Sequence, residues 1–230
     1  LHERNDGLDL LEWIRKQSFY QGEIFLWGSS YLSSVHFAWL DVAEDDIKGA
    51  ILAVQDCKRY NILYRNGFYK CGLHGGWAVG MYRKKQKISR NYTEDTFRSM
   101  PLADFSKIVF SEEDTFIQEE FKHPWPEDPF WETPEGGGEY ARALDHLNFP
   151  VLFITGFYDI YTEGILNMWD ALSPEARSKC ALVITPYDHA YLEGNKAISF
   201  PQGGLKEVWP HFFLDWCEAI REKRTPAFVS

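Results

Sequence analysis

The chain has 230 residues, of which 45% are hydrophobic and 17% aromatic, and its formal net charge is −10 at pH 7. This apolar content excludes an intrinsically disordered chain and can fill the core of one sizeable domain, or of one domain with a large insertion. The acidic balance disfavours nucleic acid and anionic membrane surfaces as partners, and no apolar run approaches the roughly 20 residues that span a bilayer.

The chain opens with a predicted amphipathic helix over residues 1–17. Leu11 and Ile14 recur there at helical spacing, and Asn5 or Asp6 is the expected N-cap. The segment lacks the apolar core and the small-residue cleavage site of a signal peptide. We therefore expect it to be part of the fold.

Four short apolar runs have the composition of buried parallel strands, because they are apolar on both faces. They lie at residues 24–27, 50–54, 151–155 and 181–185. Helical patterns follow at residues 31–43, 162–172 and 205–223, the last with an expected interruption at Pro210. Strands that alternate with helices predict an α/β fold with a parallel sheet.

About 95 residues separate the second strand from the third, which is far more than an ordinary connection. This segment is rich in aromatic residues and has helical stretches of its own, at residues 76–90 and 112–121. A stretch rich in Pro and Gly, at residues 124–138, leads back to the sheet. The expected division is a core of residues 1–56 and 149–230 with an inserted, mainly helical cap of residues 57–148.

Serines cluster where the first strand meets the following helix, at Ser29, Ser30, Ser33 and Ser34. A nucleophile at such a turn needs small neighbours, because the backbone there is strained. Ser29 has Trp27 two positions before it, and the last two serines fall in the first helical turn, where a hydroxyl usually caps the backbone. Ser30 has Gly28 two positions before it and begins the helix. Ser30 is therefore the predicted nucleophile, although Leu32 stands where the Gly-x-Ser-x-Gly elbow has glycine, and a structural Gly-Ser turn is the alternative.

A candidate acid and a candidate base follow two other predicted strands. Asp159 comes shortly after strand 151–155, and His189 shortly after strand 181–185. Functional groups of open α/β sheets gather beyond the carboxyl ends of the strands, so Ser30, Asp159 and His189 should meet at one edge. Their order along the chain is that of the α/β-hydrolases.

Each of these assignments has a rival. Asp56 follows strand 50–54 and could orient the histidine in place of Asp159. Asp188 adjoins His189, but the side chains of sequence neighbours rarely form a hydrogen bond between an imidazole ring and a carboxylate. His36 is expected to pack within its helix, and a loop histidine that caps a carbonyl is the other interpretation of His189. Four more histidines follow no predicted strand: His74, His123, His146 and His211.

The four cysteines are widely spaced and include no Cys-x-x-Cys pair: Cys57, Cys71, Cys180 and Cys217. A zinc site or disulfides compete with free, mostly buried thiols, and metal sites need ligands clustered at short spacing. We therefore expect free thiols, no metal and a reducing, cytoplasmic location.

Three stretches resemble the motifs of the X-Pro dipeptidyl-peptidase/cocaine-esterase (CocE/NonD) hydrolases, peptidase family S15. They are WGSSYLS, ITGFYDIY and TPYDHA, which correspond to Gly-x-Ser-Tyr-x-Gly, Gly-Trp-Tyr-Asp and Gly-Pro-Trp-x-His in that family. The family's elbow glycine falls at Ser33, one place after Leu32. Phe157 stands where the family has tryptophan, and Thr185 and Tyr187 replace the Gly and Trp before His189.

The resemblance implies further functional groups and further domains. The backbone N–H of Tyr31 would be one oxyanion donor, and a tyrosine hydroxyl upstream of Leu1 would be the second. Family members also carry earlier strands and a C-terminal β jelly-roll domain. We therefore expect this chain to be a central segment of a larger protein.

The predicted function is that of a serine hydrolase, either a carboxylesterase or acylase or an X-Pro dipeptidyl peptidase. Its substrate would be a small ester, an amide or a short peptide, with no cofactor. An apolar substrate pocket is expected from Trp77, Trp125, Trp131, Phe157 and Tyr161. The resemblance disfavours amino-acid ester hydrolysis, because Tyr161 and Thr162 stand where such enzymes carry carboxylates for a substrate ammonium.

A different class of function is a catalytically inactive α/β-hydrolase-fold fragment that serves in binding or assembly. Neither nucleic acid nor membrane is an expected partner, and a homo-oligomer is compatible with the sequence. The basic stretch at residues 83–90 lacks the aromatic platforms of a nucleic-acid site and is interpreted as a solvated helix face.

Overall fold

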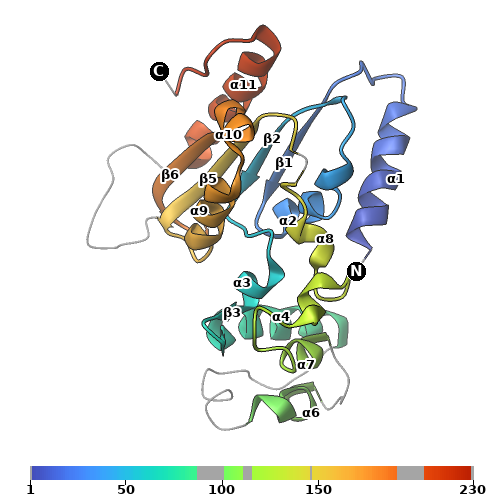
Figure 1. The fold of residues 1–230 in the computed structure, drawn as a ribbon, viewed down its shortest axis with the longest axis vertical. Coiled ribbons are helices and arrows are strands. Elements are labelled where there is room, and N and C mark those ends of the chain that lie inside the picture. The colour runs from blue at the N-terminus through green and yellow to red at the C-terminus, as the bar shows by residue number, and fades with distance from the viewer. Residues whose placement is uncertain (1, 87–100, 111–115, 146, 191–204, 229–230) are drawn as a thin grey trace. The chain divides into compact units, whose positions relative to one another are not determined.

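The computed structural model describes residues 2–86, 101–110, 116–145, 147–190 and 205–228. The chain divides into two compact units, and Figure 1 shows the elements of each. Unit 1 comprises Leu1–Lys58 and Glu139–Ser230, and unit 2 comprises Arg59–Gly138.

Unit 1 contains a four-stranded sheet in which all pairs are parallel, in the order β1-β2-β5-β6. Its strands are β1 (Ile24–Ser29), β2 (Ile47–Ala53), β5 (Val151–Tyr158) and β6 (Ala181–Asp188). The four apolar runs therefore form the predicted parallel sheet. The last two strands continue beyond their apolar runs, to Tyr158 and Asp188.

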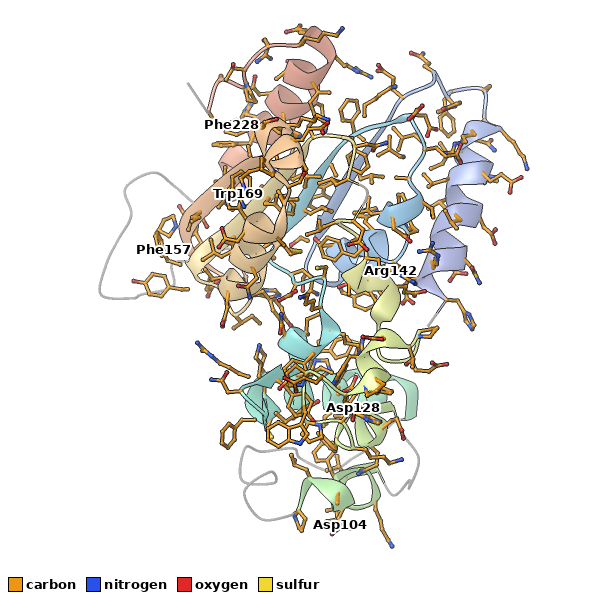
Figure 2. The ribbon with its side chains drawn as sticks, viewed as in Figure 1. Asp104, Asp128, Arg142, Phe157, Trp169 and Phe228 are labelled. Atoms are coloured by element: carbon orange, nitrogen blue, oxygen red, sulfur yellow. The ribbon has the colours of Figure 1, made fainter. Side chains whose placement is uncertain are left out.

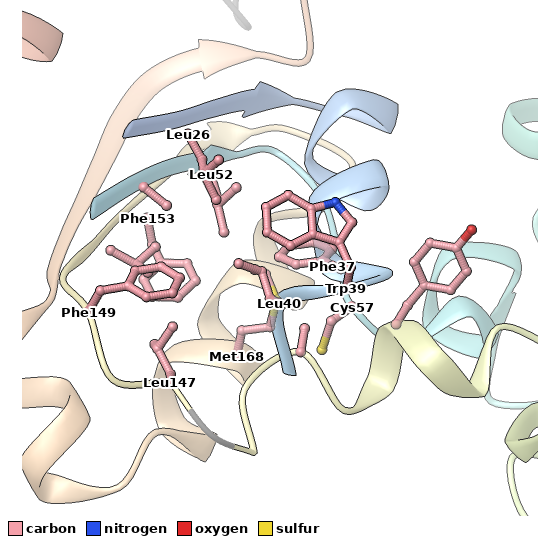
Figure 3. Packing of buried hydrophobic residues seen from close by; sticks show 14 of the residues in the cluster. Leu26, Phe37, Trp39, Leu40, Leu52, Cys57, Leu147, Phe149, Phe153 and Met168 are labelled. Atoms are coloured by element: carbon pink, nitrogen blue, oxygen red, sulfur yellow. The ribbon is translucent and has the colours of Figure 1, made fainter. Parts of the chain in front are cut away.

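The central strands are apolar on both faces because helices cover both faces. On β2, Ala50 and Leu52 belong to one buried cluster, while Ile51 and Ala53 belong to another. Helical side chains complete the first cluster, among them Phe37 and Met168 in Figure 3. The contributing helices include α1 (Glu3–Arg15), α2 (Tyr31–Phe37), α9 (Thr162–Ala171) and α10 (Pro174–Lys179). The second cluster receives Trp216 from α11 (Leu205–Glu222). Unit 1 is thus a layered α/β structure.

The first helix begins before both of its expected N-caps. Its N-cap is His2, so the expected caps, Asn5 and Asp6, lie inside the helix instead. This start places Glu3 and Asp6 in the first turn, where negative charge is favoured by the helix dipole. The guanidinium of Arg4 also donates to Asp41 at 2.6 Å, which ties this turn to the following segment.

Two other helices differ from their predictions. The pattern at residues 31–43 forms α2 only as far as Phe37, and a 3-10 turn, η1 (Leu40–Val42), follows it. Helix α11 runs unbroken from Leu205 to Glu222, so the expected interruption at Pro210 does not occur. A proline removes one helical hydrogen bond. Burial of Trp216 and Ala219 on the same helix offsets that loss.

Unit 2 is mainly helical and has its own core, which includes Tyr60, Tyr64, Phe105 and Ile117. Its elements are α3 (Arg59–Leu63), β3 (Tyr64–Arg65), β4 (Phe68–Tyr69), a π-helical turn η2 (Cys71–Gly75), α4 (Gly76–Gln86), η3 (Leu102–Asp104), α6 (Phe105–Phe110), α7 (Phe116–Glu120) and η4 (Pro129–Glu132). Parts of both predicted helical stretches, residues 87–90 and 112–115, lie outside the described residues, as do the side chains of 83–90.

The C-terminal end of the insertion differs from the predicted one, because unit 2 ends at Gly138 and the cap was expected to extend to residue 148. A short helix, α8 (Gly138–Ala141), lies there. Tyr140, Ala143 and Leu147 are buried in the first cluster of unit 1, so this stretch belongs with the sheet instead of with the insertion. No helix in the described part of the chain is long and apolar enough to cross a membrane. Cys57 is buried and the other three cysteines are half-buried, and none of the four forms a disulfide in the described part of the chain.

Candidate active site

Ser30, Asp159 and His189 each directly follow a strand of the unit 1 sheet. Ser30 comes after β1, Asp159 after β5 and His189 after β6. Because the strands are parallel, their carboxyl ends lie along one edge of the sheet. The three side chains therefore meet, although more than a hundred residues of the chain separate Ser30 from Asp159.

A chain of two hydrogen bonds joins them. Ser30 Oγ lies 2.9 Å from His189 Nε2, and His189 Nδ1 lies 2.8 Å from Asp159 Oδ2. An ionised carboxylate only accepts hydrogen bonds, so Nδ1 carries the hydrogen that is donated to Asp159. The neutral ring then presents Nε2 as the acceptor for the Ser30 hydroxyl. In this arrangement, His189 Nε2 can take the proton of the Ser30 hydroxyl.

The turn that carries Ser30 is strained. Its φ is 56° and its ψ is −128°, a conformation that costs a non-glycine residue about 1–3 kcal/mol. The N–H of Ser30 donates to Ala53 O at 2.9 Å. A Cβ at Gly28 would lie 2.4 Å from the backbone oxygen of Leu32. The need for a small residue before the nucleophile therefore arises from the backbone of α2, which passes close to Gly28.

The Asp159 carboxyl is held by the turn after β5. Its side chain is 0% exposed, and Oδ1 accepts a 2.6 Å hydrogen bond from the N–H of Tyr161. Thr162 Oγ1 lies 2.5 Å from Gly156 O and 2.7 Å from Asp159 O, and can donate to either. This role of Thr162 was not predicted from the sequence. Its signal was a threonine at the start of a predicted helix, where hydroxyls commonly bond to the backbone.

Tyr161 packs against the base. Its ring meets that of His189 edge-on, with centroids 5.3 Å apart and planes at 73°. Burial, and then the charge of Asp159, raise the pKa of Tyr161 to about 12. The phenol therefore stays neutral beside the hydrogen-bonded side chains at neutral pH.

The rival residues make other contacts. Asp56 is buried at the end of β2, and its Oδ1 accepts from Lys58 N–H at 2.8 Å. Asp188 Oδ1 accepts from the N–H of Ala190 at 2.9 Å. His36 Nε2 lies 3.1 Å from Trp27 O, so this ring contacts strand β1 and not the Asp159 carboxyl. The hydrogen bond to His189 Nδ1 is made by Asp159.

Of the predicted pocket residues, Phe157 and Tyr161 belong to unit 1. Phe157 is 72% exposed near the end of β5 and projects from the ribbon in Figure 2. Tyr31, the predicted oxyanion donor, is the first residue of α2, and its phenol donates to Glu3. N–H groups in the first turn of a helix point out of its N-terminal end.

The three tryptophans predicted for the pocket belong to unit 2. Trp77 is partly exposed and stacks on His74, with ring centroids 5.4 Å apart. Trp125 is exposed. Trp131 is only 8% exposed and packs against Tyr60, so it lies in the core of its own unit. Burial of this kind favours a structural role for Trp131 over one in an open pocket.

Comparisons with known proteins agree on one fold. Residues 1–191 match the profile of the X-Pro dipeptidyl-peptidase (S15) family. No curated protein matches the chain. Among solved structures, an α-amino acid ester hydrolase labelled with selenomethionine superposes with a TM-score of 0.72 at 16% identity, over 96% of this chain and 38% of that one.

Two other solved structures superpose less closely. A protein described as DBJA gives a TM-score of 0.52 at 14% identity, over 98% of this chain and 78% of that one. An α/β fold family hydrolase from Bacillus anthracis str. Sterne gives 0.49 at 12% identity, over 83% and 69%. The likeness to the α-amino acid ester hydrolase confirms the predicted α/β-hydrolase fold. The chain spans only 38% of the length of the α-amino acid ester hydrolase that it matches.

Proposed function

Because the chain belongs to the X-Pro dipeptidyl-peptidase (S15) family, we propose that the full-length protein is a serine hydrolase. It would transfer an acyl group from an ester or amide to water. The observation that carries this proposal is the chain of hydrogen bonds from Ser30 through His189 to Asp159.

In the proposed reaction, His189 Nε2 takes the proton of Ser30 as its Oγ attacks the substrate carbonyl. Asp159 holds the imidazole in the tautomer that leaves Nε2 as acceptor, and it stabilises the imidazolium that forms. The imidazolium then gives its proton to the leaving alcohol or amine, and an acyl-serine remains. Water, activated by the neutral imidazole, attacks that ester and releases the acid and the free serine.

The developing oxyanion needs donors in place before the reaction. Tyr31 directly follows Ser30 and begins α2, which supports its backbone N–H as the first donor. The family resemblance assigns the second donor to a tyrosine hydroxyl upstream of Leu1. Loss of one such donor typically lowers kcat by about 100- to 1000-fold.

The substrate class is an ester or a short X-Pro peptide. The solved α-amino acid ester hydrolase shares the fold, but this chain has Tyr161 and Thr162 where the resemblance places the ammonium-binding carboxylates. The Thr162 hydroxyl is bonded to the backbone of the turn, which supports a structural role for it. We therefore favour substrates without a required α-ammonium group for the ester activity.

Parallel assays test the proposal and separate its substrates. Full-length protein and its Ser30→Ala variant are incubated with short-chain nitrophenyl esters and with an X-Pro nitroanilide. Hydrolysis of either substrate by the wild type, lost in the variant, is expected. Equal hydrolysis by both proteins would contradict Ser30 as the nucleophile. Hydrolysis by neither protein would contradict the proposed activity and favour a binding or assembly role.

A further inference from the structure

A second serine at the elbow is tied to the backbone on both sides of the nucleophile. Ser33 is the third residue of α2 and is 0% exposed. Its backbone packs closely against the elbow, since a Cβ at Gly28 would lie 2.7 Å from the Ser33 nitrogen. Size does not explain its hydroxyl, because the corresponding position of the family motif is glycine.

The Ser33 hydroxyl joins the ends of two strands. Its Oγ lies 2.8 Å from Gly28 O on β1 and 3.0 Å from Ala53 O on β2, and it donates its hydrogen to one of them. The same oxygen accepts from the N–H of Ala53 at 3.1 Å. A hydroxyl has one donor and two acceptor sites, so these contacts use its donor and one acceptor in a fully buried place.

Ala53 connects this hydroxyl to the nucleophile. Its carbonyl accepts from the N–H of Ser30 at 2.9 Å, and its N–H is held by Ser33. The backbone of Ser30 is in a strained region and persists only where the surrounding structure fixes it. The end of β2 supplies that support, and Ser33 fixes the end of β2 from the other side of the turn.

Ser34 provides an internal comparison. It lies on the same helix and is also buried, at 7% exposed. Among the described residues, its hydroxyl has no hydrogen bond to Gly28 or Ala53. The two neighbouring serines therefore differ in their bonds to the strand ends and agree in size, burial and helix.

We infer that Ser33 is a positioning residue for the nucleophile, and that its hydroxyl, through Ala53, holds Ser30 Oγ within hydrogen-bond reach of His189. The inference rests on the proposed hydrolase function. Displacement of a reacting group by about 1 Å can lower a rate by roughly 100-fold. Loss of the hydroxyl should thus slow acylation of Ser30 without changing how much protein is folded.

The test compares Ser33→Ala with its matched control Ser34→Ala in the full-length protein. Each variant is labelled with a fluorophosphonate probe, and amide hydrogen exchange is measured at Ala53. We expect Ser33→Ala to be labelled roughly 10- to 100-fold more slowly and to lose protection at Ala53. Ser34→Ala should keep the wild-type rate within about threefold, with unchanged protection. In ester hydrolysis, kcat should fall in Ser33→Ala while KM stays near its wild-type value.

Equal labelling rates in the two variants would overturn the inference. If Ser33→Ala does not fold, Ser33→Gly replaces it, because glycine is the residue of the family motif and also removes the hydroxyl. A wild-type rate in that variant would overturn the inference as well. The Ser30→Ala variant separates the two levels of the argument: labelling that survives in Ser30→Ala contradicts the proposed function, whereas labelling lost there but unaffected by Ser33→Ala contradicts only the role of Ser33.

Discussion

At the scale of single residues, the site depends on how the backbone near Ser30 is packed. Gly28 leaves room for the first turn of α2, and Ser30 takes a conformation that few residues adopt. Strain of this kind places a nucleophile above the sheet edge, where a base from another strand can reach it. The small residue at Gly28 is therefore a requirement of the turn.

Gly28→Ala should damage this turn. Its new Cβ would meet backbone atoms of Leu32 and Ser33, which cannot move as freely as a side chain, so we expect a loss of about 1–3 kcal/mol in the free energy of unfolding. Urea denaturation measures it. Gly80→Ala in α4 is the matched control, because nothing lies within 4 Å of its Cβ, and it should stabilise by about 0.5–1 kcal/mol. Equal effects of the two substitutions would contradict this account of the turn.

The identity of the acid can be tested at the same scale. Asp159→Asn removes the charge that fixes the tautomer of His189 and should lower kcat by roughly 10,000-fold. Asp56→Asn alters the rival carboxylate, which accepts from Lys58, and should lower kcat by less than about tenfold. Steady-state ester hydrolysis at pH 7.5 compares them. A larger loss in Asp56→Asn would reassign the acid to β2.

At the scale of elements, the sheet and the three groups at its edge could be predicted, because buried parallel strands are continuous apolar runs. Ser30, Asp159 and His189 each follow such a run within about four residues. The cap of α1 and the uninterrupted α11 could not be predicted, because they depend on Arg4 meeting Asp41 and on burial of Trp216. The hydrogen bonds of Ser33 could not be predicted either, because their partner Ala53 is distant in sequence and reaches the elbow only when β2 pairs with β1.

The histidine on α2 gives this element a pH dependence. Burial lowers the pKa of His36 below its ordinary value of 6.5, against a smaller opposing effect of the Trp27 carbonyl. The unfolded chain therefore binds a proton more readily than the folded protein below about pH 6.5, and stability is lost as the pH falls through that value. Above it, the contribution vanishes.

His36→Gln should remove this dependence. The free energy of unfolding is measured by urea denaturation at pH 7.5 and pH 5.5 for the wild type and the variant. The difference between them should shift in favour of the variant at pH 5.5. His211→Gln, at an exposed position of α11, serves as control and should follow the wild type. A difference that is the same at both pH values for His36→Gln would contradict the argument.

At the scale of the whole molecule, two units carry separate cores. That of unit 2 is aromatic: the rings of Tyr60 and Tyr64 stack at 5.3 Å, and Trp131 meets both edge-on. The sequence showed that the insertion is rich in aromatic residues, but it did not show whether they line a pocket or fill a core. Aromatic side chains suit a pocket and a core equally well, and only their burial distinguishes the two roles.

Cys57 reports on global unfolding of unit 1. It is 4% exposed, and burial raises its pKa to about 12, so little thiolate exists in the folded state at pH 8. Iodoacetamide should therefore modify Cys57 far more slowly than the half-buried Cys217, and only at the rate at which the unit opens. Peptide mapping over time measures both. Equal rates of modification for Cys57 and Cys217 in the folded protein would show that Cys57 is accessible to solvent and would contradict this expectation.

The central claim is that Ser30 is the nucleophile of a serine hydrolase. The most direct measurement is fluorophosphonate labelling of the full-length protein, followed by mass spectrometry of its peptides. We predict one stoichiometric adduct, on Ser30, and no labelling after Ser30→Ala. An adduct on Ser29, Ser33 or Ser34, or undiminished labelling of Ser30→Ala, would contradict it.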